Sequence, residues 1–122
     1  MDELQALQAR IRAFVAERDW QQFHDPKNLA MLLASEAGEL LAEYRWVPNS
    51  EADTISRDPD KRARILSEIG DVGLSLLLLC QRIGADPVAV MSAKLELNRT
   101  RYPADQVRGK AERPASTSSQ GK

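Results

Sequence analysis

The chain has 122 residues, of which 17 are basic, 18 are acidic and 43% are hydrophobic, enough for one domain with its own core. The near-neutral charge excludes bulk electrostatic binding to nucleic acid or to an anionic membrane, which requires a large basic excess. One cysteine, Cys80, and one histidine, His24, exclude an internal disulfide and a multi-His or Cys/His metal centre. Any catalytic chemistry therefore depends on carboxylates.

The N-terminus lacks the basic start and apolar stretch of a signal peptide. The longest apolar run, residues 74–80, is far shorter than the roughly 18 residues that a membrane span needs. Cys80 lies in this run and is expected to be a buried, inert thiol. We expect a cytoplasmic protein without a transmembrane helix.

Asp-Pro pairs mark the expected helix starts, because aspartate caps the first turn and proline fits the first helical position. The pairs are Asp25-Pro26, Asp58-Pro59 and Asp86-Pro87. An earlier segment has apolar residues at helical spacing. The sequence thus predicts helices over residues 2–19, 27–46, 59–83 and 87–102, the third ending at Gly84. Residues 47–57 are polar and are expected to form a loop with one short helical turn at 51–55.

No stretch alternates strictly between apolar and polar residues, so the expected fold class is all-α, a four-helix bundle. The helices expected at 27–46 and 59–83 are apolar around more than one face, which predicts burial against another copy in a homodimer or homotetramer. We expect one domain over residues 1–103 and a disordered tail over 104–122.

Four carboxylates interrupt the most apolar stretches. Glu36 and Glu39 lie three residues apart in one expected helix, and Glu68 and Asp71 three apart in the next, so each pair shares a face. Two buried carboxylates about 4 Å apart repel by roughly 4 kcal/mol at an effective dielectric constant of about 20. Four converging acids need protonation, basic partners or a divalent cation, and Mg²⁺, which prefers oxygen ligands, is the simplest solution.

The plain alternative is that these acids line a solvated face, as many Glu-x-x-Glu pairs do. Against it, each pair encloses a glycine, Gly38 or Gly70, and Gly73 follows. A glycine inside a helix is about 1 kcal/mol less favourable than alanine. Three of them therefore indicate close approach of another helix or of a ligand.

Five motifs follow one another between residues 20 and 103. They are Trp20-Gln-Gln-Phe23-His24, Asn28-Leu29 leading into Glu36-x-x-Glu39, Tyr44-Arg45-Trp46, Glu68-x-x-Asp71-Val, and Lys94-x3-Asn98-Arg99-x-Arg101-Tyr102-Pro103. In this order they resemble the all-α nucleotide pyrophosphohydrolases of the MazG-like group, and within it the dCTP pyrophosphatases. The resemblance implies cleavage of a nucleoside triphosphate between the α and β phosphates, giving a monophosphate and pyrophosphate.

The resemblance also implies roles for single residues. The four paired acids, Glu36, Glu39, Glu68 and Asp71, would bind Mg²⁺, as the corresponding acids do in the family. Glu36 or Glu39 would orient or deprotonate the attacking water. Ser75 departs from the pattern, because dCTP pyrophosphatases have a tyrosine near the nucleotide at this position. A roomier substrate pocket is expected there.

Phosphate contacts are expected from the last helix, where Lys94, Asn98 and Arg101 share one face. Spacing alone fits a solvated basic stripe equally well. The resemblance assigns the lysine and asparagine to phosphate and sugar, and Tyr102 to the nucleotide. The charge distribution agrees, since residues 1–93 hold 10 basic and 15 acidic side chains, and residues 94–122 hold 7 and 3.

Trp20 and Trp46 are the expected base-stacking residues, since aromatic rings stack on bases with about 1–3 kcal/mol each. Phe14 and Phe23 are expected in the core. His24 either contacts the base or a phosphate or stands exposed at a helix end.

The sequence thus predicts a Mg²⁺-dependent pyrophosphohydrolase of dCTP or a related dNTP, modified cytosines included, that cleans the nucleotide pool. One alternative is a relative acting on dUTP or phosphoribosyl-ATP. Another is a non-catalytic helical module that oligomerises and keeps the acids as a metal site. A small nucleotide is the expected partner, and neither nucleic acid nor a membrane is.

Overall fold

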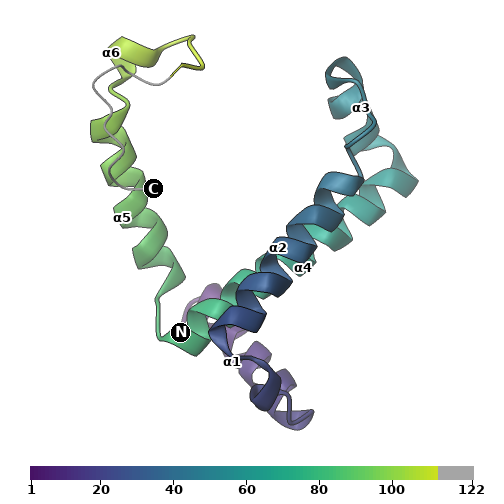
Figure 1. Ribbon diagram of the computed structural model, residues 1–122, viewed down its shortest axis with the longest axis vertical. Helices are drawn as coiled ribbons and strands as arrows, with labels where there is room; N and C mark the ends of the chain where they lie inside the picture. Colours follow the sequence, from purple (N-terminus) through teal and green to yellow (C-terminus); the bar gives the residue numbers. More distant parts are fainter. Residues whose placement is uncertain (113–122) are drawn as a thin grey trace. The chain divides into compact units, whose positions relative to one another are not determined.

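Helices make up the regular secondary structure of residues 1–112, the part of the chain that the computed structural model describes (Figure 1). The all-α class is confirmed. The chain divides into two compact units, Met1–Ala85 and Asp86–Lys122. The elements in order are α1 (Glu3–Glu17), the 3-10 turn η1 (Gln21–Phe23), α2 (Pro26–Ala42), the 3-10 turn η2 (Asn49–Glu51), α3 (Ala52–Arg57), α4 (Pro59–Ile83), α5 (Pro87–Arg101) and α6 (Ala104–Val107).

Capping aspartates fix the helix starts. Asp25, Asp58 and Asp86 each accept a hydrogen bond, 2.9 to 3.2 Å long, from a backbone N–H of the following first turn. Gly84 ends α4 in the left-handed region, with φ at 70°, which a residue without Cβ adopts freely. The four main helices consequently begin within one residue of their predicted positions.

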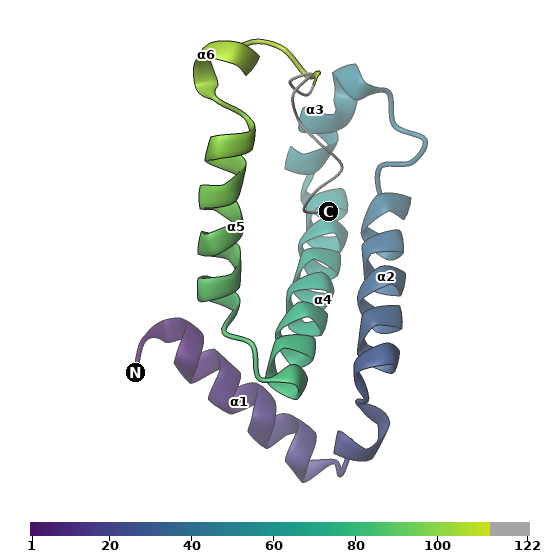
Figure 2. The same cartoon turned by 60° about the vertical axis from the view of Figure 1, so that its left-hand side comes forward.

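In the first unit, α2 packs antiparallel along α4, and the two helices lie side by side in both views (Figures 1 and 2). α1 and α3 also pack on α4. The Gln81 side-chain amide donates a hydrogen bond to the backbone carbonyl of Gln8 at 2.9 Å and so ties the C-terminal end of α4 to α1. The long helix α4 is therefore the common support of this unit.

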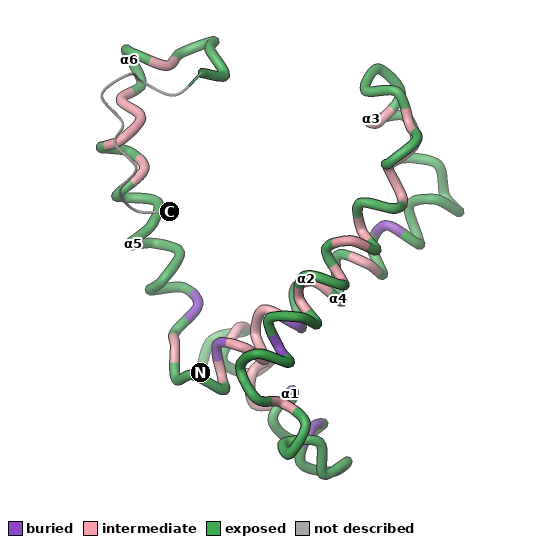
Figure 3. Tube along the Cα trace, in the orientation of Figure 1, coloured by how far each residue is buried: buried purple, intermediate pink, exposed green. Residues whose placement is uncertain are grey.

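Few side chains are buried within the described chain (Figure 3). Leu29 on α2 is the most deeply buried, at 1% exposure, and the predicted burial of Cys80 is confirmed. The remaining buried residues are Ile11, Val15, Ile65, Ser75 and Pro87. Many large apolar side chains stay exposed, among them Leu66 and Ile69 on α4, at 49% each.

The predicted end of the second helix was wrong. α2 ends at Ala42 rather than at 46, because the next residues form turns in which Tyr44 N–H bonds to Leu41 and Val47 N–H bonds to Tyr44. The Tyr44 hydroxyl also lies 2.6 Å from Ser56 Oγ on α3. The segment over 47–57 is mostly helical, since η2 and α3 occupy it. The short turn predicted at 51–55 overlaps α3, but the helical part is longer than expected.

The prediction that Phe14 and Phe23 lie in the core was also wrong, since they are 48% and 59% exposed. The Phe14 ring meets Trp20 edge-on, with centroids 5.7 Å apart. The Arg18 guanidinium lies 3.7 Å from the Phe14 ring centroid. These contacts stabilise an aromatic residue at the surface, where apolar spacing alone suggested burial.

Gly38, Gly70 and Gly73 face open space, because a Cβ built at each of them meets no atom within 4 Å. Close packing of another helix within the unit Met1–Ala85 therefore does not explain them. Approach of a ligand or of a second copy stays a prediction.

The second unit consists of α5 and α6 in its described part. α6 lies in the region expected to be disordered, and residues 113–122 of that tail lie outside the described residues. The boundary at residue 103 stays a prediction. Within residues 1–112, no helix is long and apolar enough to cross a membrane.

Candidate functional site

Three of the four predicted acids converge where the middle of α2 faces the middle of α4. One carboxylate oxygen from each of Glu36, Glu68 and Asp71 lies within 4.8 Å of the other two. Glu36 and Glu68 are half-buried, and Asp71 is exposed. The convergence follows from register, because Glu68 and Asp71 share a face of α4 and the antiparallel α2 brings Glu36 opposite.

Glu39 is exposed and does not belong to this group of three. Its charge nevertheless acts there. Desolvation, together with the negative charges of Asp71, Glu39, Glu36 and Glu43, raises the pKa of Glu68 above its ordinary value of 4.5. The acids of this site therefore repel one another, and Glu68 carries the effect of that repulsion.

Arg64 lies on α4 beside this region, and it pairs with a fifth acid. Its Nε lies 3.2 Å from Glu43 Oε1, which joins the C-terminal end of α2 to the second turn of α4. Arg64 precedes Glu68 by one helical turn. The ion pair occupies Arg64, yet the charge of Glu43 still contributes to the raised pKa of Glu68.

The donor set fits a hard divalent cation. Three carboxylates offer oxygen ligands and no sulfur or nitrogen, which is the chemistry that Mg²⁺ or Mn²⁺ prefers. The raised pKa of Glu68 is the response expected when such acids converge without a cation. Glu36, Glu68 and Asp71 are thus candidate ligands, with Glu39 one turn from Glu36.

An apolar pocket of about 410 Å³ begins about one helical turn from the acids on both α2 and α4. On α4 its wall is Leu74 and Leu78, three and seven residues after Asp71, and on α2 it is Leu32, four before Glu36. These spacings keep the pocket on the same helix faces as the carboxylates. α1 and Trp20 complete the lining.

The two predicted stacking residues are separated. Trp20 lines the apolar pocket and is 43% exposed. Trp46 is 87% exposed and does not line it. The residues flank opposite ends of α2, whose 17 residues span about 25 Å. One base cannot contact both rings of a single chain.

His24 and Ser75 are positioned differently from each other. His24 is half-buried and lines the apolar pocket. Ser75 is 3% exposed, and its hydroxyl donates a hydrogen bond to the Asp71 carbonyl at 2.7 Å. The hydroxyl proton of Ser75 is therefore used by its own helix, and the roomier substrate pocket expected at this position stays a prediction.

The predicted phosphate-binding residues belong to the second unit. Asn98 and Tyr102 are half-buried near the end of α5, and Asn98 accepts a backbone hydrogen bond from Tyr102 at 2.8 Å. The Arg101 guanidinium lies 5.5 Å from the Tyr102 ring centroid. Lys94 lies two turns before Arg101 on the same helix. Their contact with a nucleotide stays a prediction.

A solved pyrophosphatase from Archaeoglobus fulgidus shares this fold. The match has a TM-score of 0.78 and 30% sequence identity, and it covers 84% of this chain and 94% of that chain. The chain belongs to the all-α nucleoside triphosphate pyrophosphohydrolases. Within this family it is MazG-like and lies near the dCTP pyrophosphatases, as the resemblance predicted.

Curated relatives of this pyrophosphohydrolase-family chain carry the name dCTP pyrophosphatase 1. The human protein is 43% identical over 96 residues, covering 78% of this chain and 56% of its own length. The bovine protein is 39% identical over 98 residues, covering 80% and 58%. The chain thus spans somewhat more than half the length of these relatives. No family model matches it.

Sequence reasoning missed two features near the site of this pyrophosphohydrolase-family member. The Glu43–Arg64 pair depends on how α2 lies on α4, which local spacing does not reveal. Arg12, Gln81 and Arg82 line a second pocket that shares residues with the apolar one. The sequence did hold a signal for the second pocket, because the spacing of Asp71, Leu78 and Arg82 places them on one face of α4.

Proposed function

We propose that the chain is a Mg²⁺-dependent pyrophosphohydrolase that converts dCTP or a related dNTP to the monophosphate and pyrophosphate. The observation that carries this proposal is the adjacency of three converging carboxylates and an apolar pocket on the same faces of α2 and α4. A nucleotide with its triphosphate at the carboxylates and its base against Trp20 would fit this arrangement. The dCTP pyrophosphatase relatives favour a cytosine base.

In the proposed reaction, a water oxygen bonds to the α-phosphorus and the bridging bond to the β-phosphate breaks. Pyrophosphate leaves with the bonding electron pair, and the water proton passes to a carboxylate. Glu36 or Glu39 would orient or deprotonate that water. Mg²⁺ held by Glu36, Glu68 and Asp71 would neutralise phosphate charge when bound.

The remaining predicted contacts divide between binding phosphate and binding the base. Lys94, Asn98 and Arg101 would hold phosphate and sugar, with Tyr102 packing on the nucleotide. His24 would line the base end of the site. The buried Ser75 would contribute space for a substituted base.

We also propose that the active form is a homodimer or homotetramer. Leu66, Ile69, Gly70 and Gly73 form an exposed stripe on α4, which a second copy would cover. The separation of Trp20 and Trp46 supports this, since two copies could bring the two rings to one base. Light scattering tests it, and a monomer at working concentration would contradict it.

Removal of unwanted nucleotides from the cytoplasmic pool would be the role of such an enzyme. The single cysteine and the absence of a membrane-spanning helix in residues 1–112 are compatible with that location. Neither nucleic acid nor a membrane is part of the proposed reaction.

The test is a panel of the eight common nucleoside triphosphates and phosphoribosyl-ATP, each with Mg²⁺, with products separated by chromatography. We expect dCTP to give dCMP and pyrophosphate in equal amounts. Preferred turnover of dUTP or phosphoribosyl-ATP would assign the chain to another branch of the family. A Mg²⁺-induced rise in melting temperature without any turnover would favour a non-catalytic metal-binding module and would overturn the proposal.

A further inference from the structure

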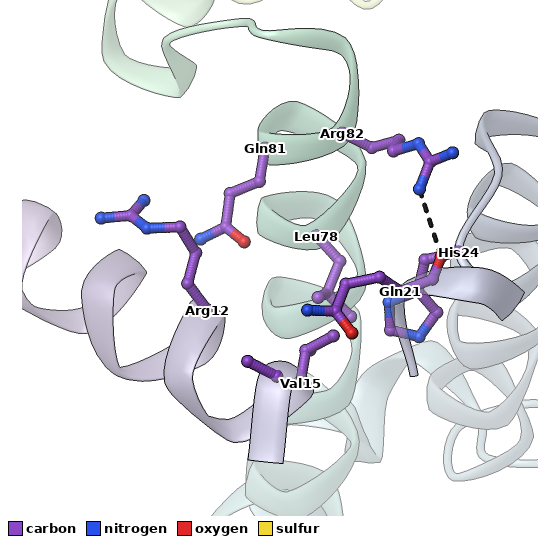
Figure 4. Close-up of a pocket in the computed structure, with 8 residues that line it drawn as sticks. Arg12, Val15, Gln21, His24, Leu78, Gln81 and Arg82 are labelled. Atoms are coloured by element: carbon purple, nitrogen blue, oxygen red, sulfur yellow. Dashed lines mark hydrogen bonds between the residues drawn. The ribbon is translucent and has the colours of Figure 1, made fainter. Parts of the chain in front are cut away.

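A second, polar pocket of about 320 Å³ lies next to the apolar one. Figure 4 shows Arg12 and Val15 from α1, Gln21 and His24 from the following segment, and side chains from the last turns of α4. Val15, His24 and Leu78 line both pockets. The two pockets are therefore contiguous.

The polar pocket offers hydrogen-bond donors and positive charge. Two guanidinium groups, from Arg12 and Arg82, and the amides of Gln21 and Gln81 line it, and no carboxylate does. The Arg82 guanidinium donates one hydrogen bond to the Gln21 carbonyl at 3.2 Å, the dashed line in Figure 4. This bond leaves further N–H groups of Arg82 for a ligand, because arginine carries five.

Distance along α4 separates this pocket from the acids. Leu78 and Arg82 follow Asp71 by seven and eleven residues, which is about 10 to 16 Å along the helix axis. The order on this face is carboxylates, apolar wall, arginines. The arginines consequently do not pair with the acids.

We propose that the polar pocket binds an anionic, oxygen-rich group of the carboxylate or phosphate class. Arginine side chains match the oxygens of both groups with paired hydrogen bonds, and Val15 and Leu78 would exclude water from one side. The group has two sources. It is either a substituent on the base that occupies the apolar pocket or a free anion.

Titration of the full chain with inorganic phosphate, without divalent metal and against potassium chloride at equal ionic strength, tests the pocket. We expect saturable binding in the wild type and in Arg62→Ala, a control on α4 outside the pocket whose side chain bonds to the Ser56 carbonyl. Arg12→Ala should weaken phosphate binding about tenfold or more, since hydrogen bonds to charged groups are the strong ones. Arg12 makes no hydrogen bond or ion pair within residues 1–112, so this variant should fold normally.

A second variant, Arg82→Lys, keeps the charge but loses the paired geometry, and it should also weaken binding. Absence of saturable phosphate binding in the wild type would overturn the proposal. Equal affinities in the wild type and Arg12→Ala would overturn it as well.

Kinetics distinguishes a substituent on the base from a free anion as the bound group, and this experiment rests on the proposed function. The ratio of kcat/KM for a cytosine nucleotide with a C5 carboxylate to that for dCTP is compared between the wild type and Arg12→Ala. A ratio that falls about tenfold in the variant assigns the pocket to a base substituent. An unchanged ratio, with phosphate binding lost, assigns it to a free anion. Failure of all turnover would refute the proposed function while leaving the phosphate titration decisive.

Discussion

Two stretches of α4 bear opposite charge on one face. The middle of the helix holds Glu68 and Asp71 against Glu36 of α2, and its C-terminal end holds Arg82 near Arg12 of α1. Between them lies the apolar pocket. An anion binds directly at arginines, whereas at the carboxylates it needs a cation between itself and the protein.

The same anionic ligand therefore has opposite requirements at the two stretches. Removal of divalent metal should abolish phosphate recognition at the acids and leave it intact at the arginines. The pKa of Glu68 reports the unbalanced charge at the acids, because it is raised by desolvation and by Asp71, Glu39, Glu36 and Glu43.

Loss of one acid should abolish most turnover. Glu68→Gln keeps the shape of the side chain but removes a candidate metal ligand. We expect kcat/KM for dCTP to fall more than about 100-fold, beyond the range typical of residues that only support metal ligands. Pyrophosphate release measures this. The exposed Glu51, on η2, provides the control Glu51→Gln, and equal activity of the two variants would contradict the assignment.

Loss of the indole in the apolar pocket should reduce turnover less. Trp20→Ala removes a stacking surface worth about 1–3 kcal/mol, which corresponds to a fall of roughly 5- to 150-fold in kcat/KM. Phe23→Ala is the matched control, because Phe23 is exposed and does not line the pocket. A loss confined to Phe23→Ala would place the base elsewhere.

The pH dependence of stability should reveal the repulsion between the acids. The pKa of Glu68 is raised in the folded protein, so proton binding at Glu68 stabilises the fold. This stabilisation is fully present below about pH 4.5 and is lost as the pH rises through the raised pKa. In metal-free solution, Glu68→Gln should therefore gain in Tm over the wild type as pH increases. Melting curves from about pH 4 to pH 8 measure the difference. A difference that does not change with pH would contradict this account.

The smallest effect is expected at the ion pair between α2 and α4. Arg64 is largely exposed, with 58% of its side chain accessible. Arg64→Ala should lower the free energy of unfolding by no more than about 1 kcal/mol, as is typical of surface pairs. Denaturant unfolding measures it, with Lys61→Ala on the same helix as the control. A larger loss would mean that Arg64 also compensates the group of three acids.

Local chemistry explains which parts of the fold were predictable. Asp25, Asp58 and Asp86 act on the turn that follows each of them, so the sequence alone locates the helix starts. The end of α2 was not predictable in this way. The contact of Tyr44 with Ser56 joins residues twelve apart and depends on how α3 packs.

The candidate site was likewise predictable where it depends on spacing within one helix, and not where it depends on packing between segments. The i, i+3 spacing of Glu68 and Asp71 was enough to predict a shared face, and packing against α2 then brought in Glu36. Helix periodicity did not predict the exposed position of Phe14, since its contacts with Trp20 and Arg18 come from the chain beyond α1's last turns. The polar pocket was missed because three separate segments line it.

A crystal structure with Mg²⁺ and a non-hydrolysable dCTP analogue, carrying a methylene bridge between the α and β phosphates, tests whether the three carboxylates and the apolar pocket form one nucleotide site. We expect a cation bound by carboxylate oxygens of Glu36, Glu68 and Asp71, with the triphosphate on it and the cytosine ring against Trp20. A cation held away from these three carboxylates, or a base outside the apolar pocket, would contradict it.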